Sequence, residues 1–162
     1  MPLINAVKGG KPALFTVHQL QELVAMNIAN ITFGYLQGIS NVLRTGERSG
    51  VKAIAGGPMS VTRSGGLFTC ASVMYISKSN YYVHHANAGD ERLNDFQTAT
   101  QALGAPLNDV SVVYAHPNQH DAEYRKSVNQ IISWGVPAAQ VLEIANLPFN
   151  SFGINNEGRL GY

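Results

Sequence analysis

The stretch "GGLFTCASVMYISKSNYYVHHANAGD", residues 65–90, decides the fold because it predicts a β-hairpin. Its two halves, residues 67–76 and 81–88, are rich in β-branched and aromatic side chains, which favour strands. The residues between them, 78–80, are a lysine, a serine and an asparagine, which suit a tight turn. A paired, largely apolar hairpin in the middle of the chain indicates that the core is built on a β-sheet.

Helices and strands are expected on both sides of this hairpin. Leu20, Leu23, Val24 and Ile28 lie about one helical turn apart, and Thr16 suits the N-cap of that helix. Further helices are expected over 91–103 and 121–134, strands over 51–61 (broken at 56–58), 109–117 and 139–147, and a final hairpin over 152–162.

These elements predict one α+β domain, sandwich-like, with a mixed sheet and hairpins flanked by a few helices. Residues 1–15 are interrupted by glycine and proline, so we expect a loosely held arm or an edge strand there. The whole chain, residues 1–162, contains no repeat and no linker long enough to divide it, so it is expected to form a single domain.

Composition excludes several classes of function. The 11 Lys and Arg residues nearly balance the 10 Asp and Glu residues, so neither nucleic acid nor a membrane surface is an expected partner. No apolar run approaches a transmembrane length, and the N-terminus does not resemble a secretory signal. A single cysteine cannot form an internal disulfide, so the fold does not require an oxidising compartment.

That cysteine, Cys70, lies in the first half of the hairpin, and His84 and His85 lie in the second half. A thiol becomes a strong nucleophile when it loses its proton, and a neighbouring imidazole can accept that proton. A lone cysteine in a strand is more often a small buried apolar residue. The sequence therefore allows a Cys–His catalytic pair or a core thiol.

The length of the hairpin loop decides which histidine shares a face with the thiol, because side chains alternate between the two faces of a strand. An even loop, such as residues 79–80, would place Met74 opposite His85 and put His85 on the face of Cys70. A three-residue loop, 78–80, would put His84 there instead. We favour His85.

We favour His85 because the even loop would place apolar and aromatic side chains over the site. With that loop, Tyr81 and Val83 share a face with Ser72, Met74 and Ile76, and would shield the site from water.

The residues around the cysteine resemble a known family. "TRSGGLF", residues 62–68, is a glycine-rich turn that leads into the cysteine strand, and "YYVHHANAG", residues 81–89, follows with histidines. The arrangement is similar to the cysteine deamidases that include the cytotoxic necrotizing factors, the chemotaxis-receptor glutamine deamidases and the Burkholderia lethal factor. The resemblance covers residues 64–89. It departs from the family directly before the cysteine, where Phe68 and Thr69 replace the usual serine and glycine.

The resemblance implies a function and a set of site residues. Cys70 would be the nucleophile and His85 the general base, and Ser64 stands at the spacing of the family's third catalytic element, with Thr62 as the fallback. The implied reaction is deamidation of a glutamine side chain on a partner protein, without a cofactor or a metal. The implied role is that of a bacterial, toxin-like effector, cytoplasmic in its producing cell or delivered into a target cell without a classical signal peptide.

A metal site is one alternative. "HPNQH" places His116 and His120 four residues apart, and Cys70, His84 and His85 could complete a ligand set for zinc. Pro117 follows His116 at the end of a strand, so this pair lacks the regular i, i+4 spacing of a zinc-binding helix.

A non-catalytic binding module is the other alternative. It would use Tyr81, Tyr82 and Tyr162 as exposed interface residues, since tyrosine is common in interfaces.

Overall fold

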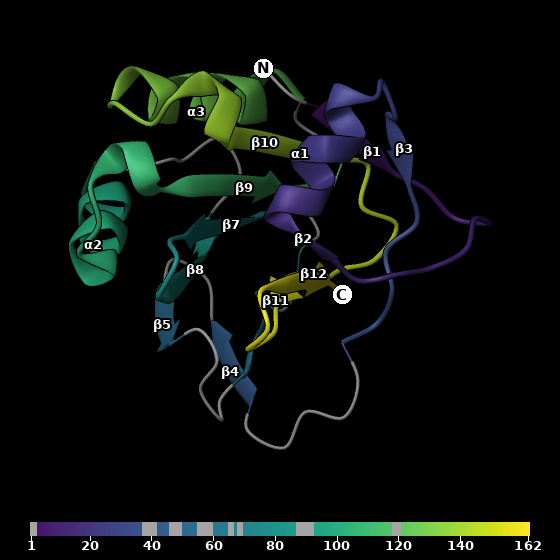
Figure 1. Cartoon of the computed structure of the whole chain (residues 1–162), viewed down its shortest axis with the longest axis horizontal. Helices are drawn as coiled ribbons and strands as arrows, with labels where there is room; N and C mark the ends of the chain where they lie inside the picture. The colour runs from purple at the N-terminus through teal and green to yellow at the C-terminus, as the bar shows by residue number, and fades with distance from the viewer. Residues whose placement is uncertain are drawn as a thin grey trace.

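The computed structural model describes residues 3–36, 42–45, 50–54, 60–64, 67, 70–86, 93–117 and 121–162. Within these ranges the chain forms a single α+β domain, as predicted. A large mixed sheet lies between two helices on one face and a third helix with a small antiparallel sheet on the other (Figure 1).

The large sheet has seven strands in the order β3-β1-β10-β9-β7-β8-β5. Neighbours among β3, β1, β10 and β9 are parallel, whereas β7, β8 and β5 join on in antiparallel pairs. The strands are β1 (Leu3–Ala6), β3 (Asn30–Ile31), β5 (Gly50–Ile54), β7 (Ala71–Ile76), β8 (Asn80–Ala86), β9 (Ser111–Ala115) and β10 (Val141–Ala145). The central hairpin thus joins the parallel half of the sheet to its antiparallel edge.

Two smaller sheets complete the β-structure. β2 (Phe15–Thr16), β11 (Gly153–Ile154) and β12 (Arg159–Gly161) form an antiparallel sheet, which confirms the predicted final hairpin. β4 (Val42–Thr45) and β6 (Ser60–Ser64) form a parallel pair. The turn of the final hairpin contains Gly158, at φ +77°, a conformation that favours glycine.

Three α-helices lie where the sequence predicts them. α1 (Val17–Ala25) begins at Thr16, whose side chain accepts a hydrogen bond from the backbone of Gln19 while the Gln19 side chain accepts one from the backbone of Thr16. This reciprocal capping confirms Thr16 as the N-cap, although Ile28 lies beyond the end of the helix. The other helices are α2 (Leu93–Leu103) and α3 (Asp121–Ser133), and short 3₁₀ turns, η1 (Leu107–Asp109) and η2 (Ala138–Gln140), precede β9 and β10.

The core has two parts, one on each face of the large sheet. On the face covered by α2 and α3, here called the α2/α3 face, buried helical side chains pack on the strands: Phe96, Ala99, Tyr124, Val128 and Ile131 against Val73, Tyr75, Val112 and Tyr114. On the other face, here called the α1 face, α1 and the small antiparallel sheet supply Leu20, Ile154 and Leu160 against Met74, Val83, Val113 and Leu142. These two faces separate the side chains of the candidate sites described below.

The prediction of a loose arm or an edge strand at residues 1–15 is wrong for residues 3–6. β1 lies inside the large sheet, between β3 and β10, and Ile4 is fully buried. Its main partner, β10, is about 140 residues away in the sequence, so no local pattern marks β1 as an interior strand.

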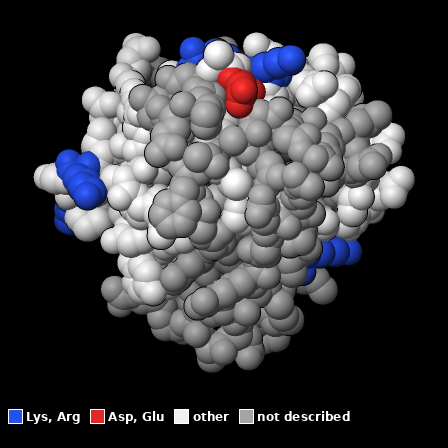
Figure 2. Space-filling view, turned by 180° about the vertical axis from the view of Figure 1, so that it is seen from behind, with Lys and Arg blue, Asp and Glu red and all other residues white. Residues whose placement is uncertain are grey.

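The described surface carries little concentrated charge on the face shown in Figure 2. The charged side chains described there lie near its margin, where acidic and basic groups stand together at the top and further basic groups lie at the left and right. Among the described helices the longest, α3, has 13 residues, and none combines the length and apolar character needed to cross a membrane.

Candidate functional site

The central hairpin turns over two residues, Lys78 and Ser79. The backbone N–H of Ser77 donates to the carbonyl of Asn80 at 2.9 Å, and the Ser77 hydroxyl donates to the same oxygen at 3.0 Å. Asn80 is already the first residue of β8, and Ile76 pairs with Tyr81. The loop is therefore even, as favoured from the sequence, but it lies one residue earlier than residues 79–80.

The register of the hairpin places the two histidines on opposite faces. Ser72 pairs with His85, and Val73 pairs with His84. The predicted pairing of Met74 with His85 is wrong, because Met74 pairs with Val83. The shift of two residues preserves the alternation of side chains, so His85 still lies on the α1 face with Ser72 and Met74.

Cys70 lies on this same face, directly before the first residue of β7. It is half-buried and packs against the core cluster of the α1 face, which includes Met74 and Val83. In an antiparallel pair, residues one diagonal apart on a shared face have Cα atoms about 7–8 Å apart. The register begins at Ala71, and continuing it by one residue would put Cys70 in this diagonal relation to His85, since Cys70 precedes Ser72 by two residues. The structure therefore brings the predicted thiol and imidazole to one face of one hairpin.

The strand pairing also places the side chains that were predicted to shield this face from water. Tyr81 pairs with Ile76 and Val83 pairs with Met74, and all four side chains belong to the core cluster of the α1 face. Tyr81 is only 5% exposed, and its burial raises the pKa of the phenol above its ordinary value. His85 is itself only 3% exposed, so the imidazole is shielded from bulk water on nearly all sides.

The segment between β10 and β11 holds the cysteine from both sides. Before Cys70, the backbone N–H of Leu67 donates to the carbonyl of Asn150 at 2.7 Å. After it, the fully buried Ser72 donates from its hydroxyl to the carbonyl of Phe152 at 3.1 Å. Sequence reasoning did not single out Ser72 as a polar contact of this kind, although a serine in an apolar strand is a signal for a buried hydrogen bond.

Ser64 and Thr62, the candidate third elements, lie in β6. Ser64 is the last residue of this strand and pairs with Thr45 of β4, and β6 lies against β7 and β8. Their side chains are outside the description, so their role in orienting His85 stays a prediction.

The residues of the alternative metal site are divided between the two faces of the sheet. His84 lies on the α2/α3 face, and His116 stacks on Tyr124 of α3 with ring centroids 4.1 Å apart. Cys70 and His85 lie on the α1 face, so the sheet itself separates the two pairs. His120 lies outside the described residues, and the described residues contain no group of three potential metal ligands.

The tyrosines of the alternative binding module are less exposed than the sequence suggested. Tyr81 is buried, Tyr82 is half-buried beside the core of the α2/α3 face, and Tyr162 is half-buried against Phe149. The prediction of an exposed aromatic interface from these three residues is therefore wrong.

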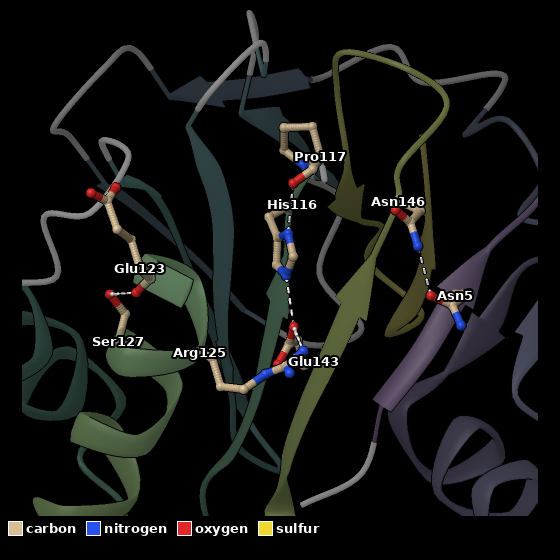
Figure 3. A network of polar contacts seen from close by, with 8 residues as sticks. All are labelled: Asn5, His116, Pro117, Glu123, Arg125, Ser127, Glu143 and Asn146. Atoms are coloured by element: carbon tan, nitrogen blue, oxygen red, sulfur yellow. Dashed lines mark hydrogen bonds and ion pairs between the residues drawn. The ribbon is translucent and has the colours of Figure 1, made fainter. Parts of the chain in front are cut away.

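A polar network that the sequence reasoning missed lies on the α2/α3 face. Glu143, in the middle of β10, accepts a hydrogen bond at its Oε2 atom from His116 Nε2 at 2.8 Å. The same oxygen is 3.5 Å from the guanidinium of Arg125, which reaches it from α3 (Figure 3). His116 also donates from Nδ1 to the carbonyl of Pro117 at 2.7 Å. The network thus connects the residue that follows β9, the centre of β10 and helix α3.

The charge on Glu143 is stabilised despite its burial. Burial by itself raises the pKa of this carboxyl, but the hydrogen bond and charge of His116, followed by those of Arg125, outweigh it and hold the pKa below its ordinary value. The two ring nitrogens of His116 both face oxygen atoms, one of the Pro117 carbonyl and one of the Glu143 carboxylate. The side chains of His116 and Glu143 are 0% and 1% exposed, so the pair is closed to solvent and serves the structure rather than a substrate.

A signal for this network is present in the sequence. Residues 139–147, "AQVLEIANL", place one glutamate in the middle of an apolar strand. A buried carboxylate requires a partner, so a charged residue in such a run predicts a cation or histidine on the facing element.

Comparison with known proteins does not assign the chain to a family. No protein-family model matches the chain, and no curated protein is similar enough to be counted as a relative. The interpretation of Cys70 and His85 therefore depends on their own positions and chemistry.

Proposed function

We propose that this protein is a cysteine hydrolase that deamidates a glutamine side chain on a partner protein, with Cys70 as nucleophile and His85 as general base. The observation that carries the proposal is the two-residue turn, because it puts His85 on the face of Cys70 and one diagonal away from it. His84, the adjacent histidine, lies on the other face and is not available to the thiol.

The reaction has two stages. The Cys70 sulfur attacks the carboxamide carbon of glutamine, and His85 takes the thiol proton and delivers it to the departing ammonia. The resulting thioester is then attacked by water, with the same imidazole accepting the proton of the water, and glutamate and free thiol are released. The target gains a negative charge, because a neutral amide becomes a carboxylate.

The surroundings of the cysteine support this chemistry. Cys70 is half-buried rather than fully buried, so part of the residue is open to the surroundings. Ser72, two residues after the nucleophile, is fixed by its hydrogen bond to the carbonyl of Phe152. An anchored strand favours the reaction because less of the site must be ordered when the substrate binds.

The test compares the reactivity of Cys70 in two histidine variants. Iodoacetamide should label Cys70 in the native protein rapidly at pH 7, because a neighbouring imidazole can accept the proton of the thiol. His85→Ala should slow labelling markedly, since it removes the group that accepts this proton. His84→Ala is the matched control and should leave the labelling rate close to that of the wild type.

Three results would contradict the proposal. Labelling that requires denaturation would identify Cys70 as a structural thiol. Equal rates in both variants would show that no Cys–His pair exists, and slowing by His84→Ala alone would reverse the assignment of the histidines. Ammonia release from glutamine-containing proteins, absent in Cys70→Ser, then tests the reaction itself.

A further inference from the structure

A cavity lies away from Cys70 and His85, at the carboxyl ends of the parallel strands. Its volume is about 460 Å³, within the usual range for small-molecule sites. Residues that follow β1, β3 and β10 line it, including Lys8, Thr32 and Phe149. In α/β sheets, ligands bind preferentially outside the carboxyl ends of parallel strands. The position of the cavity therefore matches that of a ligand site in such folds.

The one charged side chain that lines the cavity is a cation. It belongs to Lys8, and the other lining side chains are uncharged. Among the described residues Lys8 has no ion-pair partner. Its ammonium group is thus available to an anion bound in the cavity.

The loop that carries Lys8 is held in place at Gly10 and leaves room in front of Gly9. The backbone N–H of Gly10 donates to the Thr32 hydroxyl at 3.1 Å, and a Cβ atom on Gly10 would come within 2.5 Å of that oxygen. Gly9 adopts φ +92°, and no atom lies within 4 Å of the place where its Cβ would be. The loop therefore approaches β3 closely at Gly10 and leaves an open space at Gly9.

Another wall of the cavity is aromatic. The rings of Phe149 and Tyr162 stack with their centroids 4.1 Å apart and their planes at 19°, and both are half-buried. Phe33 adds a buried ring, which packs edge-on against Phe152. Aromatic walls of this kind bind planar apolar groups by contact with the ring faces and edges.

We propose that this cavity binds a small aromatic carboxylate, with its ring against Phe149 and Tyr162 and its carboxylate beside the Lys8 ammonium. The aromatic wall selects a planar ring, and the unpaired cation selects a negative charge at one end of the ligand. A simple inorganic anion would leave the aromatic wall unused, and a neutral aromatic molecule would leave Lys8 unused. The site is independent of the proposed deamidase chemistry, because neither Cys70 nor His85 lines the cavity.

The test is an NMR titration of the ¹⁵N-labelled chain with 2-naphthoate, its neutral analogue 2-naphthamide and inorganic phosphate. With 2-naphthoate, the amide signals of Gly9 and Gly10 should shift in a saturable way. Because Lys8 is exposed, we expect the carboxylate to bind about two- to fivefold more tightly than the amide. Phosphate should produce no saturable shift at these glycines.

Two variants and a matched control assign the contacts. Lys8→Gln should lower the affinity for 2-naphthoate to that for 2-naphthamide, whereas Lys11→Gln, an exposed lysine outside the cavity, should not. Phe149→Leu should weaken both ligands by about two- to tenfold through loss of ring contact. Unchanged amide signals elsewhere in the spectrum check that each variant remains folded.

The proposal is overturned if 2-naphthoate shifts no signal around the cavity, if phosphate reproduces its shifts, or if the amide binds equally well. Equal effects of Lys8→Gln and Lys11→Gln would also overturn it. Cys70→Ser should retain binding, so loss of the thiol chemistry and loss of this site remain distinguishable.

Discussion

Replacing Glu143 by glutamine tests whether the buried network stabilises the fold through charge. The substitution keeps the size of the side chain and an oxygen that can accept from His116 Nε2, but it removes the negative charge. The hydrogen bond from His116 is 2.8 Å long, and both side chains are shielded from solvent. Charge is therefore what the substitution changes, with little change in packing.

The expected loss in the free energy of unfolding follows from how deeply each partner of Glu143 is buried. A hydrogen bond to a charged group contributes about 1.5–3 kcal/mol, and removing one member of a buried ion pair costs about 3–5 kcal/mol. Arg125 adds little, because its side chain is 49% exposed and its contact with Glu143 is 3.5 Å. Since glutamine keeps an acceptor, we expect Glu143→Gln to lower the free energy of unfolding by about 2–3 kcal/mol at pH 7. This corresponds to a fall in Tm of about 4–12 °C for a chain of this size.

The loss should depend on pH in a defined direction. The pKa of Glu143 is lower in the folded protein than its ordinary value of 4.5, so the unfolded chain binds the proton more readily. The stabilisation is therefore complete above that ordinary value and is lost as the pH falls through the lower folded pKa. The difference between wild type and Glu143→Gln should be largest near pH 7 and should shrink below about pH 4.5.

Urea denaturation at several pH values measures this difference. Glu22→Gln is the matched control, because Glu22 pairs with His18 in an exposed i, i+4 contact on α1 and should cost less than about 0.5 kcal/mol. Equal costs for the two variants at pH 7, or a cost for Glu143→Gln that grows as the pH falls, would refute the reasoning.

Two further substitutions test the first part of the chain. Ile4→Ala should cost about 2–5 kcal/mol in urea denaturation, because Ile4 is fully buried in an interior strand; a loss below about 0.5 kcal/mol would mean that β1 is the loose arm expected from the sequence. Thr16→Ala should cost about 1 kcal/mol through loss of the N-cap hydrogen bond to Gln19, whereas Thr16→Ser should cost little; equal losses for both would contradict the capping role.

Local patterns determined much of the secondary structure of this chain. The N-cap at Thr16 depends on Thr16 and Gln19 alone, which are three residues apart, so it is visible in the sequence. The central and final hairpins are predicted for the same reason, because turn residues and flanking strands are neighbours along the chain. Whether Cys70 and His85 share a face depends only on whether the loop has an even or an odd number of residues. The prediction is therefore unaffected by an error of two residues in the register.

Tertiary structure decided the features that depend on distant segments. β1 is an interior strand only because β10 and β3 pair with its two edges, and no short window contains both partners. The place of the hairpin in the large sheet was also decided by distant segments, since β7 pairs with β9 and β8 pairs with β5.

At Glu143, sequence and tertiary structure each determine a different part of a single site. The sequence by itself determined that a carboxylate lies in an apolar strand and that a histidine ends the strand before it. Only the parallel pairing of β9 with β10, and the packing of α3 across them, brings His116 and Arg125 to that carboxylate. Side-chain pairs of this kind form between residues 18 and 27 positions apart, and their energy depends on burial that exists only after the sheet and helix have packed.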